Sequence, residues 1–360
     1  MRSIDFSPDR WESTLKNYSA WWRGQLNRPL INLTLDGRDP GRLKPDIPLL
    51  DQSNCHMLDI PANDIIDRID YELSSQIYLG DSFPYFNLDC FGPGIIAAFL
   101  GAELDNSTGM VWFHPKSVRP ISELHFEYDP DNIWLNRLKD IYREGMRRWQ
   151  GQVLMVMADL GGTLDILSTF RPADLLLLDL YDSPEEVKRL IWELHDLWLK
   201  FYTDLREAAE PYNPGYSDWS KIICEEPFYM LQCDICYMLS PQMFDEFVRP
   251  ELQSMCRALP HSMYHLDGVG QLNKLDSLLK IDELDGVQWI PGDGKPDPSH
   301  WPEVFHKIAA ANKNIQVLGD FDCLDTVVEQ TGMPGRIHSC IWQAAPDEKE
   351  ARKRIEKYMG

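Results

Sequence analysis

The stretch SMYHLDGVGQLNKLDSLLKI, residues 262–281, places a short β-rich run directly before an amphipathic helix. The same pairing of strand and helix is repeated three more times toward the C-terminus. The later pairs are 286–293 with 301–311, 315–322 with 324–332, and 336–344 with 346–359. Alternation of this kind is typical of βαβ units, whose strands lie parallel in one sheet. It fits both a closed barrel and an open doubly wound sheet.

Earlier strands are predicted at residues 29–35, 153–159 and within 228–239. No internal repeat, low-complexity tract or Gly/Ser linker divides the chain, so we expect a single domain. Within it, residues 1–28 are expected to form an N-terminal helical extension and residues 29–358 the α/β core. No G-x-G-x-x-G or Walker loop opens a helix, which disfavours a nucleotide-binding open sheet.

Composition narrows the class of protein and its partners. The 360 residues are 44% hydrophobic and 26% charged, as in a globular protein, and no apolar run is long enough to span a bilayer. The start of the chain lacks the features of a secretory signal, and eight irregularly spaced cysteines fit reduced thiols, so we expect a cytoplasmic protein. A formal net charge of -22 disfavours nucleic acid as a partner.

Polar residues spaced two apart near predicted strand ends are the candidates for chemistry. Catalytic groups of a barrel lie where its strands end, and strand residues i and i+2 face the same side. The pairs are His265 and Asp267, Asp320 and Asp322, and His338 and Cys340. We take Asp320 as a candidate catalytic residue and His338 as a candidate substrate contact. Trp342, on the same face as Cys340, is a candidate aromatic contact for the substrate.

A metal site is one interpretation of these residues. His265, Asp267 and Cys340 together supply an imidazole, a carboxylate and a thiolate, and three protein ligands with an open position are typical of catalytic zinc. The alternative is a polar core histidine, a turn-capping aspartate and a buried thiol. Cys233 and Cys236 form a CxxC pattern, but positions i and i+3 of a strand face opposite ways, so buried thiols are favoured. Asp234, between them, is a candidate catalytic or substrate-contacting residue.

Longer motifs resemble a known family. Residues 228–255 (FYMLQCDICYMLSPQMFDEFVRPELQSM), followed by residues 264–275 (YHLDGVGQLNKL), resemble the central region of the uroporphyrinogen decarboxylase superfamily. There, L-S-P-x-x-F-x-E-F-x-x-P precedes a strand that ends in a His motif. Residues 157–167, 175–194 and 338–351 resemble the family's substrate loop, its D-x-P-E-x-V helix and its final strand. The resemblance implies a (β/α)₈ TIM barrel with extra N-terminal helices.

The methyltransferase branch of that family holds zinc through an H-x-C pair and a later Cys. His265 matches the first ligand and Cys340 the last, whereas Asp267 stands at the position of the middle Cys. The resemblance therefore implies zinc bound by these three residues, and a corrinoid supplied by a separate partner protein. A carboxylate ligand makes the ion harder and less suited to a thiol substrate.

The decarboxylase branch carries an R-Q-A-G-R motif whose arginines bind substrate carboxylates. Residues 34–38 read TLDGR here, which keeps Arg38 as a candidate carboxylate contact and lacks the first arginine. Asp81, in GDSFPYF, loosely resembles the branch's essential aspartate. Asp234 stands at the position of a pocket Ser and Cys340 at that of a late His. These departures disfavour the decarboxylase.

The leading hypothesis is therefore an enzyme that moves a methyl group between a corrinoid protein and a small molecule at a metal site in the barrel mouth. One alternative is a uroporphyrinogen decarboxylase-like lyase in which Asp81 stabilises a protonated pyrrole and Arg38 binds a carboxylate. Another is a non-catalytic protein that binds a tetrapyrrole or corrinoid.

Overall fold

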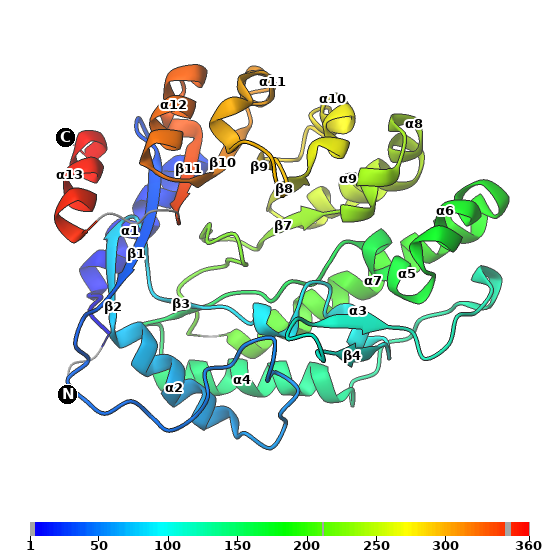
Figure 1. The fold of residues 1–360 in the computed structure, drawn as a ribbon, viewed down its shortest axis with the longest axis horizontal. Helices are drawn as coiled ribbons and strands as arrows, with labels where there is room; N and C mark the ends of the chain where they lie inside the picture. The colour runs from blue at the N-terminus through cyan, green and yellow to red at the C-terminus, as the bar shows by residue number, and fades with distance from the viewer. Residues whose placement is uncertain (1–3, 211, 343–346, 360) are drawn as a thin grey trace.

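A computed structural model describes residues 4–210, 212–342 and 347–359 (Figure 1). Its central element is a seven-stranded sheet of order β2-β1-β11-β10-β9-β8-β7. The strands are β1 (Leu30–Asp36), β2 (Gln76–Gly80), β7 (Phe228–Gln232), β8 (His261–Asp267), β9 (Gly286–Ile290), β10 (Asn314–Gly319) and β11 (Ile337–Ile341). Every neighbouring pair is parallel except β1 and β2. The protein is thus an α/β protein dominated by parallel strands.

Helices alternate with the C-terminal strands as the sequence predicts. They are α9 (Arg249–Ala258), α10 (Leu275–Leu278), α11 (Pro302–Ala310), α12 (Phe321–Thr331) and α13 (Glu348–Met359). Figure 1 shows α10, α11 and α12 in a row along one side of the sheet. Each unit is short because the helix reverses the chain directly after its strand, which places the ends of successive strands at one edge.

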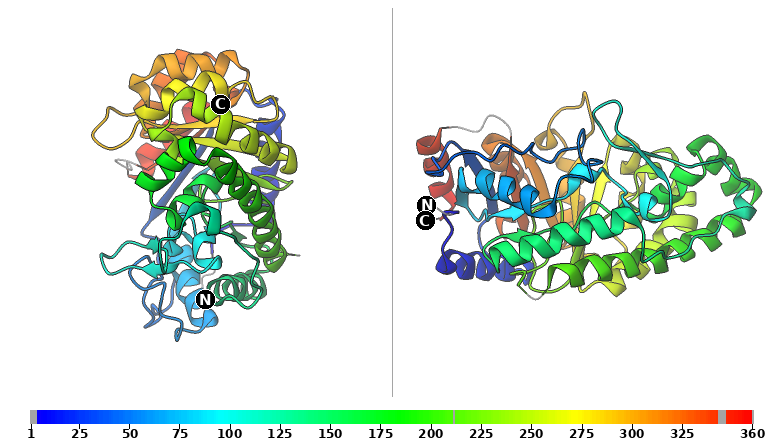
Figure 2. Two further views of the ribbon diagram at one scale, coloured as in Figure 1. Left: turned by 90° about the vertical axis from the view of Figure 1, so that its right-hand side faces the viewer. Right: turned by 90° about the horizontal axis from the view of Figure 1, so that it is seen from below.

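The N-terminal half adds helices, which include α1 (Pro8–Trp22) before the first strand. The others are α2 (Ala62–Ser74), α3 (Ile96–Phe99), α4 (Ile133–Trp149), α5 (Thr163–Phe170), α6 (Ala173–Asp182), α7 (Pro184–Ala209) and, further on, α8 (Pro241–Met243). The long helices α4 and α7 lie side by side, as Figure 2 shows. Short strands complete this half: β3 (Tyr85–Phe86), β4 (Glu103–Asp105), β5 (Trp112–His114) and β6 (Leu154–Met155).

The first and last predicted strands are neighbours. β1 pairs in parallel with β11, with Leu30 opposite His338 and Asn32 opposite Cys340. This adjacency is required of a barrel, and it confirms the expected neighbours. The predicted last strand covered residues 336–344, of which β11 accounts for 337–341; residues 343 and 344 lie outside the described residues.

The hydrogen-bonded ladder does not close into a barrel within the described residues. β3 and β6 form a separate parallel pair, and β2 runs antiparallel along the edge of β1. Because β2 occupies that edge, no further strand pairs with β1 there. Side chains bridge the other gap: Gln232 Nε2, on β7, donates to Asp159 Oδ1, just after β6, at 3.1 Å. The sheet is therefore open in its backbone pairing.

Two further expectations concern the whole chain. Within the described residues, no helix combines the length and the apolar character that crossing a bilayer requires. The eight cysteines are all buried and unpaired, as expected for thiols that do not form a disulfide framework.

Candidate metal centre

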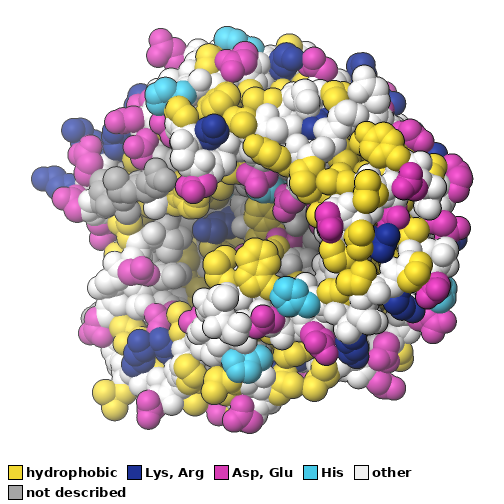
Figure 3. Space-filling model, turned by 45° about the vertical axis from the view of Figure 1, so that its right-hand side comes forward, with side chains coloured by type: hydrophobic (Ala, Val, Ile, Leu, Met, Phe, Trp, Pro, Cys, Tyr) yellow, Lys and Arg dark blue, Asp and Glu magenta, His cyan; other side chains and the backbone are white. Residues whose placement is uncertain are grey.

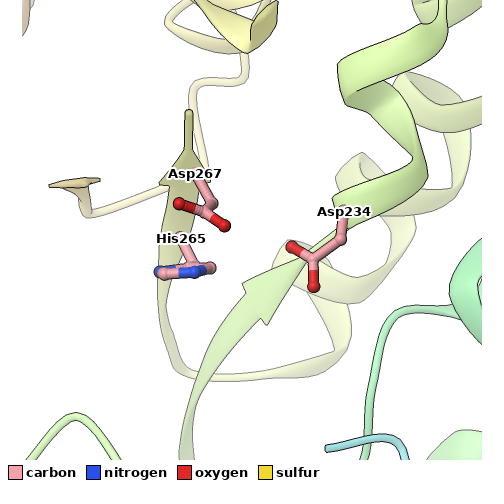
Figure 4. Close-up of side chains that lie close together, drawn as sticks. All are labelled: Asp234, His265 and Asp267. Atoms are coloured by element: carbon pink, nitrogen blue, oxygen red, sulfur yellow. The ribbon is translucent and has the colours of Figure 1, made fainter. Parts of the chain in front are cut away.

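Three polar side chains meet where β7 and β8 end. His265 and Asp267 lie on β8, and Asp234 begins the short helix η3 (Asp234–Met238), two residues after β7. One ligand atom from each residue lies within 4.8 Å of the other two, and Figure 4 shows Asp234 facing the β8 pair. The arrangement follows from the sequence: i and i+2 share a strand face, and β7 is the parallel neighbour of β8. We call these three residues the metal triad.

The backbone of Asp234 is held from a third element. Asp165, in the first turn of α5, accepts hydrogen bonds from the backbone N of Asp234 and of Ile235, both at 2.9 Å. Helix α5 comes this close because Gly162 precedes it: a Cβ there would lie 2.2 Å from the carbonyl oxygen of Gln232. Burial, and then the charge of Asp234, raise the pKa of Asp165 to about 7. Sequence reasoning missed Asp165, whose only signal is an acidic residue in a helix's first turn.

Burial, charge and hydrogen bonding act on individual members of the triad. Desolvation raises the pKa of Asp234; His265 opposes this shift and Asp267 adds to it. His265 Nδ1 is hydrogen-bonded to Gln288 Oε1, and the rings of Trp219 and His265 pack in a T-shaped arrangement with centroids 5.1 Å apart. An oriented imidazole and two carboxylates form a donor set that binds divalent ions such as Zn²⁺ or Mn²⁺. The residues present therefore fit a metal site.

Cys340 is not brought to the triad, which corrects the ligand set expected from the sequence. Two strands, β9 and β10, separate β11 from β8 in the sheet, so three spacings of about 4.8 Å place them about 14 Å apart along it. The sulfur instead lies 3.9 Å from the carbonyl oxygen of Ser220 and 4.0 Å from Gln316 Nε2. Burial raises the pKa of the Cys340 thiol, and Lys221 opposes this shift. Asp234 takes the third place in the cluster.

Two cavities adjoin these residues, and Trp342 lines both. One, of about 450 Å³, contains Asp267, Asp293, Lys295 and Leu318 in its wall. The other, of about 190 Å³, contains Asn32, Lys221 and Cys340. Trp342 is 62% exposed, and its contact with a substrate stays a prediction. Figure 3 shows a hollow on this face with acidic, basic and apolar side chains around it.

No sequence pattern singles out Lys221, which the structure places in the smaller cavity. Its backbone has a φ of 63°, a left-handed conformation that is costly for a residue with a side chain. Its Nζ lies 5.4 Å from the centroid of the Tyr85 ring. Within the described part of the chain it forms no ion pair with a carboxylate. Burial lowers the pKa of Lys221, but Tyr85 and Cys340 outweigh this effect and raise it, so the side chain stays cationic.

Asp81 has a structural role rather than the catalytic one expected. Its carboxylate is 1% exposed and forms a two-point ion pair with Arg28, at 2.7 and 2.8 Å. It also accepts hydrogen bonds from the backbone N of Ile31 at 3.0 Å and from Asn17 Nδ2 at 2.9 Å. These bonds use the carboxylate to join helix α1 to strand β1, which leaves it unable to meet a substrate.

Arg38 and Asp320 are also tied into local structure. Arg38 donates to the carbonyl oxygen of Ser74 at 2.6 Å and lies 3.7 Å from a carboxylate oxygen of Asp5. Asp320 caps helix α12, because its side chain accepts from the backbone N of Cys323 at 2.8 Å. Neither residue lines the two cavities. The substrate contact expected of Arg38 and the catalytic role expected of Asp320 therefore stay predictions that these contacts do not support.

His338 does not contact a substrate either, because it is fully buried inside the sheet. Its Nε2 lies 3.0 Å from Tyr18 Oη, and its Nδ1 lies 3.0 Å from Gln316 Nε2. Burial, and then the charge of Lys221, lower the pKa of His338 to about 3, so the imidazole is neutral. It belongs to the polar interior of the fold.

Comparison with known proteins adds evidence on the fold. No protein-family model and no curated protein matches the sequence. Among solved structures, the chain is similar to a methyltransferase from Methanosarcina mazei, with a TM-score of 0.60 and 9% sequence identity. The match covers 96% of this chain and 99% of that chain. The chain thus shares its overall fold with that protein over nearly its whole length.

Proposed function

We propose that this chain is a metal-dependent methyltransferase built on a distorted (β/α)₈ barrel of the uroporphyrinogen decarboxylase type. The observation that carries the proposal is the metal triad, which lies where two adjacent parallel strands end, the position of catalytic groups in barrels. The structural likeness to a methyltransferase over nearly the full chain supports it. Asp234, His265 and Asp267 would hold the metal and leave at least one position open.

The donor set bears on the substrate. A divalent cation bound there supplies Lewis acidity that stabilises a deprotonated heteroatom of the methyl acceptor. One imidazole and two carboxylates make a harder site than one with thiolates, so an oxygen or nitrogen acceptor suits it better than a thiol. The 450 Å³ cavity beside Asp267 has the size of a small-molecule pocket. Trp342 offers an exposed indole face against which the acceptor can pack.

The methyl donor in this proposal is a methylated corrinoid on a separate protein.

Lys221 would attract an anionic group of the acceptor into the smaller cavity, because its charge is not neutralised by an ion pair in the described residues. The decarboxylase alternative loses support, since Asp81 and Arg38 both hold local structure together.

Metal analysis of two variants tests the proposal. Protein purified without a histidine tag should contain about one divalent ion per chain, and Asp234→Asn should lose most of it together with methyl transfer from methylcobalamin. Cys340→Ala is the matched control, because Cys340 lies outside the triad: it should keep the metal. Absence of metal from the wild-type chain, or full retention by Asp234→Asn, would overturn the proposal. Uptake of cobalamin without turnover of any acceptor would favour the non-catalytic binder.

A further inference from the structure

A row of polar side chains crosses the interior of the sheet at one level. The strand register places His265 opposite Gln288, Gln288 opposite Gln316, and Gln316 opposite His338. Cross-strand partners in a parallel sheet point to the same side, so the four side chains face one interior. Gln288, Gln316 and His338 are all 0% exposed. Polar groups buried to this degree must satisfy one another, since water does not reach them.

The direction of every hydrogen bond in this row follows from one backbone carbonyl. Gln316 Nε2 lies 2.6 Å from the carbonyl oxygen of Ser220, which can only accept, so the atom facing it must be the amide nitrogen. Gln316 therefore turns its Oε1 toward Gln288, whose Nε2 donates to it. That leaves Gln288 Oε1 facing His265 Nδ1, and an oxygen acceptor requires a proton on that nitrogen. His265 is thus the Nδ1–H tautomer, with its lone pair on Nε2.

The far end of the row keeps the same direction. Gln316 Nε2 also faces His338 Nδ1 at 3.0 Å, which requires an unprotonated Nδ1. The neutral state of His338 meets this requirement, because a second proton would place two donors against each other. The Ser220 carbonyl and the neutral His338 both accept hydrogen bonds from Gln316 Nε2, which fixes the orientation of Gln316 and, through it, that of Gln288. Neither amide can turn over without setting donor against donor or acceptor against acceptor.

We propose that Gln288, oriented by Gln316, is a positioning residue that fixes the tautomer of His265 and so presents its Nε2 lone pair to the metal. This inference rests on the proposed function, since it explains how one ligand of the triad is prepared. Ligating histidines commonly donate their second ring nitrogen to an acceptor, and loss of that acceptor typically lowers metal affinity about 10- to 100-fold. Here the acceptor is an amide whose orientation is set across two further strands.

The tautomer can be measured without any metal. Protein labelled with ¹⁵N-histidine and treated with chelator is studied by long-range ¹H–¹⁵N correlation spectra, with His265→Gln used to assign the signal. The wild-type chain should show the Nδ1–H form of His265, and Gln288→Leu should show a mixture of both tautomers. Gln288→Glu keeps an acceptor oxygen and nearly the same volume, so it should retain the Nδ1–H form even if the leucine variant does not fold.

Gln271→Leu is the matched control, because Gln271 is another buried glutamine, bonded to Tyr264 and Cys233 and not to His265. It should leave the tautomer unchanged. The affinity for Zn²⁺, measured against a competing chelator, should fall about 10- to 100-fold in Gln288→Leu and remain near the wild-type value in the control.

An Nε2–H wild-type tautomer, or an unchanged tautomer in Gln288→Leu, would overturn the inference. If the tautomers are as expected but the wild-type protein binds no Zn²⁺, the result would support the role of Gln288 in positioning His265 and would overturn the metal-dependent function.

Discussion

Replacing His338 with glutamine should make the protein less sensitive to acid unfolding. Burial lowers the pKa of this histidine from 6.5 to about 3, so the folded chain excludes a proton that the unfolded chain binds. Stability from the neutral imidazole is complete above pH 6.5 and is lost as the pH falls toward 3. At about 1.4 kcal/mol per unit, the interval of about 2.5 units from pH 6.5 to pH 4 corresponds to about 3 kcal/mol.

Urea unfolding of the wild-type protein and of His338→Gln at pH 7 and pH 4 measures this quantity. It is the loss of unfolding free energy between the two pH values in the wild type minus the same loss in the variant. The wild-type chain should lose about 3 kcal/mol more than His338→Gln between the two pH values. Other titrating groups are common to both chains and cancel, as does any packing defect that does not depend on pH. His306→Gln is the control, since it removes an exposed histidine. Equal losses in the wild type and in His338→Gln would refute the reasoning.

Three further changes test other parts of the structure. Burial raises the pKa of Asp159 from 3.8 to about 8, so wild-type stability should fall as the pH rises through that interval. Asp159→Asn should remove this loss and raise the free energy of unfolding at pH 8 by on the order of 3 kcal/mol relative to wild type. The gain is smaller than the full pKa shift would give, because the carboxyl is only half-buried. Equal dependence of urea unfolding on pH in the two proteins would contradict this. Gly335→Ala should cost at least about 2 kcal/mol and lower Tm, because its Cβ would lie 1.8 Å from the carbonyl oxygen of Leu26; an unchanged Tm would disprove the close approach. Arg28→Met should cost about 3 to 5 kcal/mol by leaving the Asp81 charge buried and unpaired, and adding Asp81→Asn should recover part of it; no recovery in that double-mutant cycle would argue against the ion pair as the cause.

Local patterns predicted part of the site. His265 and Asp267 lie together because residues two apart on a strand point to the same face. The turn that follows marks the end of the strand. Cys340 shares the same local signature with His338, yet its distance from the triad depends on the order of four strands. That order is a property of the whole sheet. The nearer neighbour, Asp234, joined the triad because β7 is adjacent to β8.

The open edge of the sheet and the role of Asp81 could not be predicted from local sequence patterns either, because both depend on contacts between distant parts of the chain. Residues 76–80 were not among the predicted strands, and nothing in their periodicity gives the direction in which they pair with β1. Asp81 follows directly and meets Arg28, 53 residues earlier in the chain. A resemblance to a family aspartate identified the position as important, whereas the ion pair determined what the carboxylate does.

The amide row has a consequence for how this protein can diverge. A single change at Gln288 or Gln316 leaves the partner amide without its hydrogen bond in a dry interior, at a cost of about 1 to 3 kcal/mol. Replacing both removes that mismatch between the two amides, but it leaves the Ser220 carbonyl and His338 without the donor that Gln316 supplies. We therefore expect the two positions to change together. Related proteins that keep one of the two glutamines should keep the other. Those that lack one should lack both, and in them His265 should no longer be oriented by an amide.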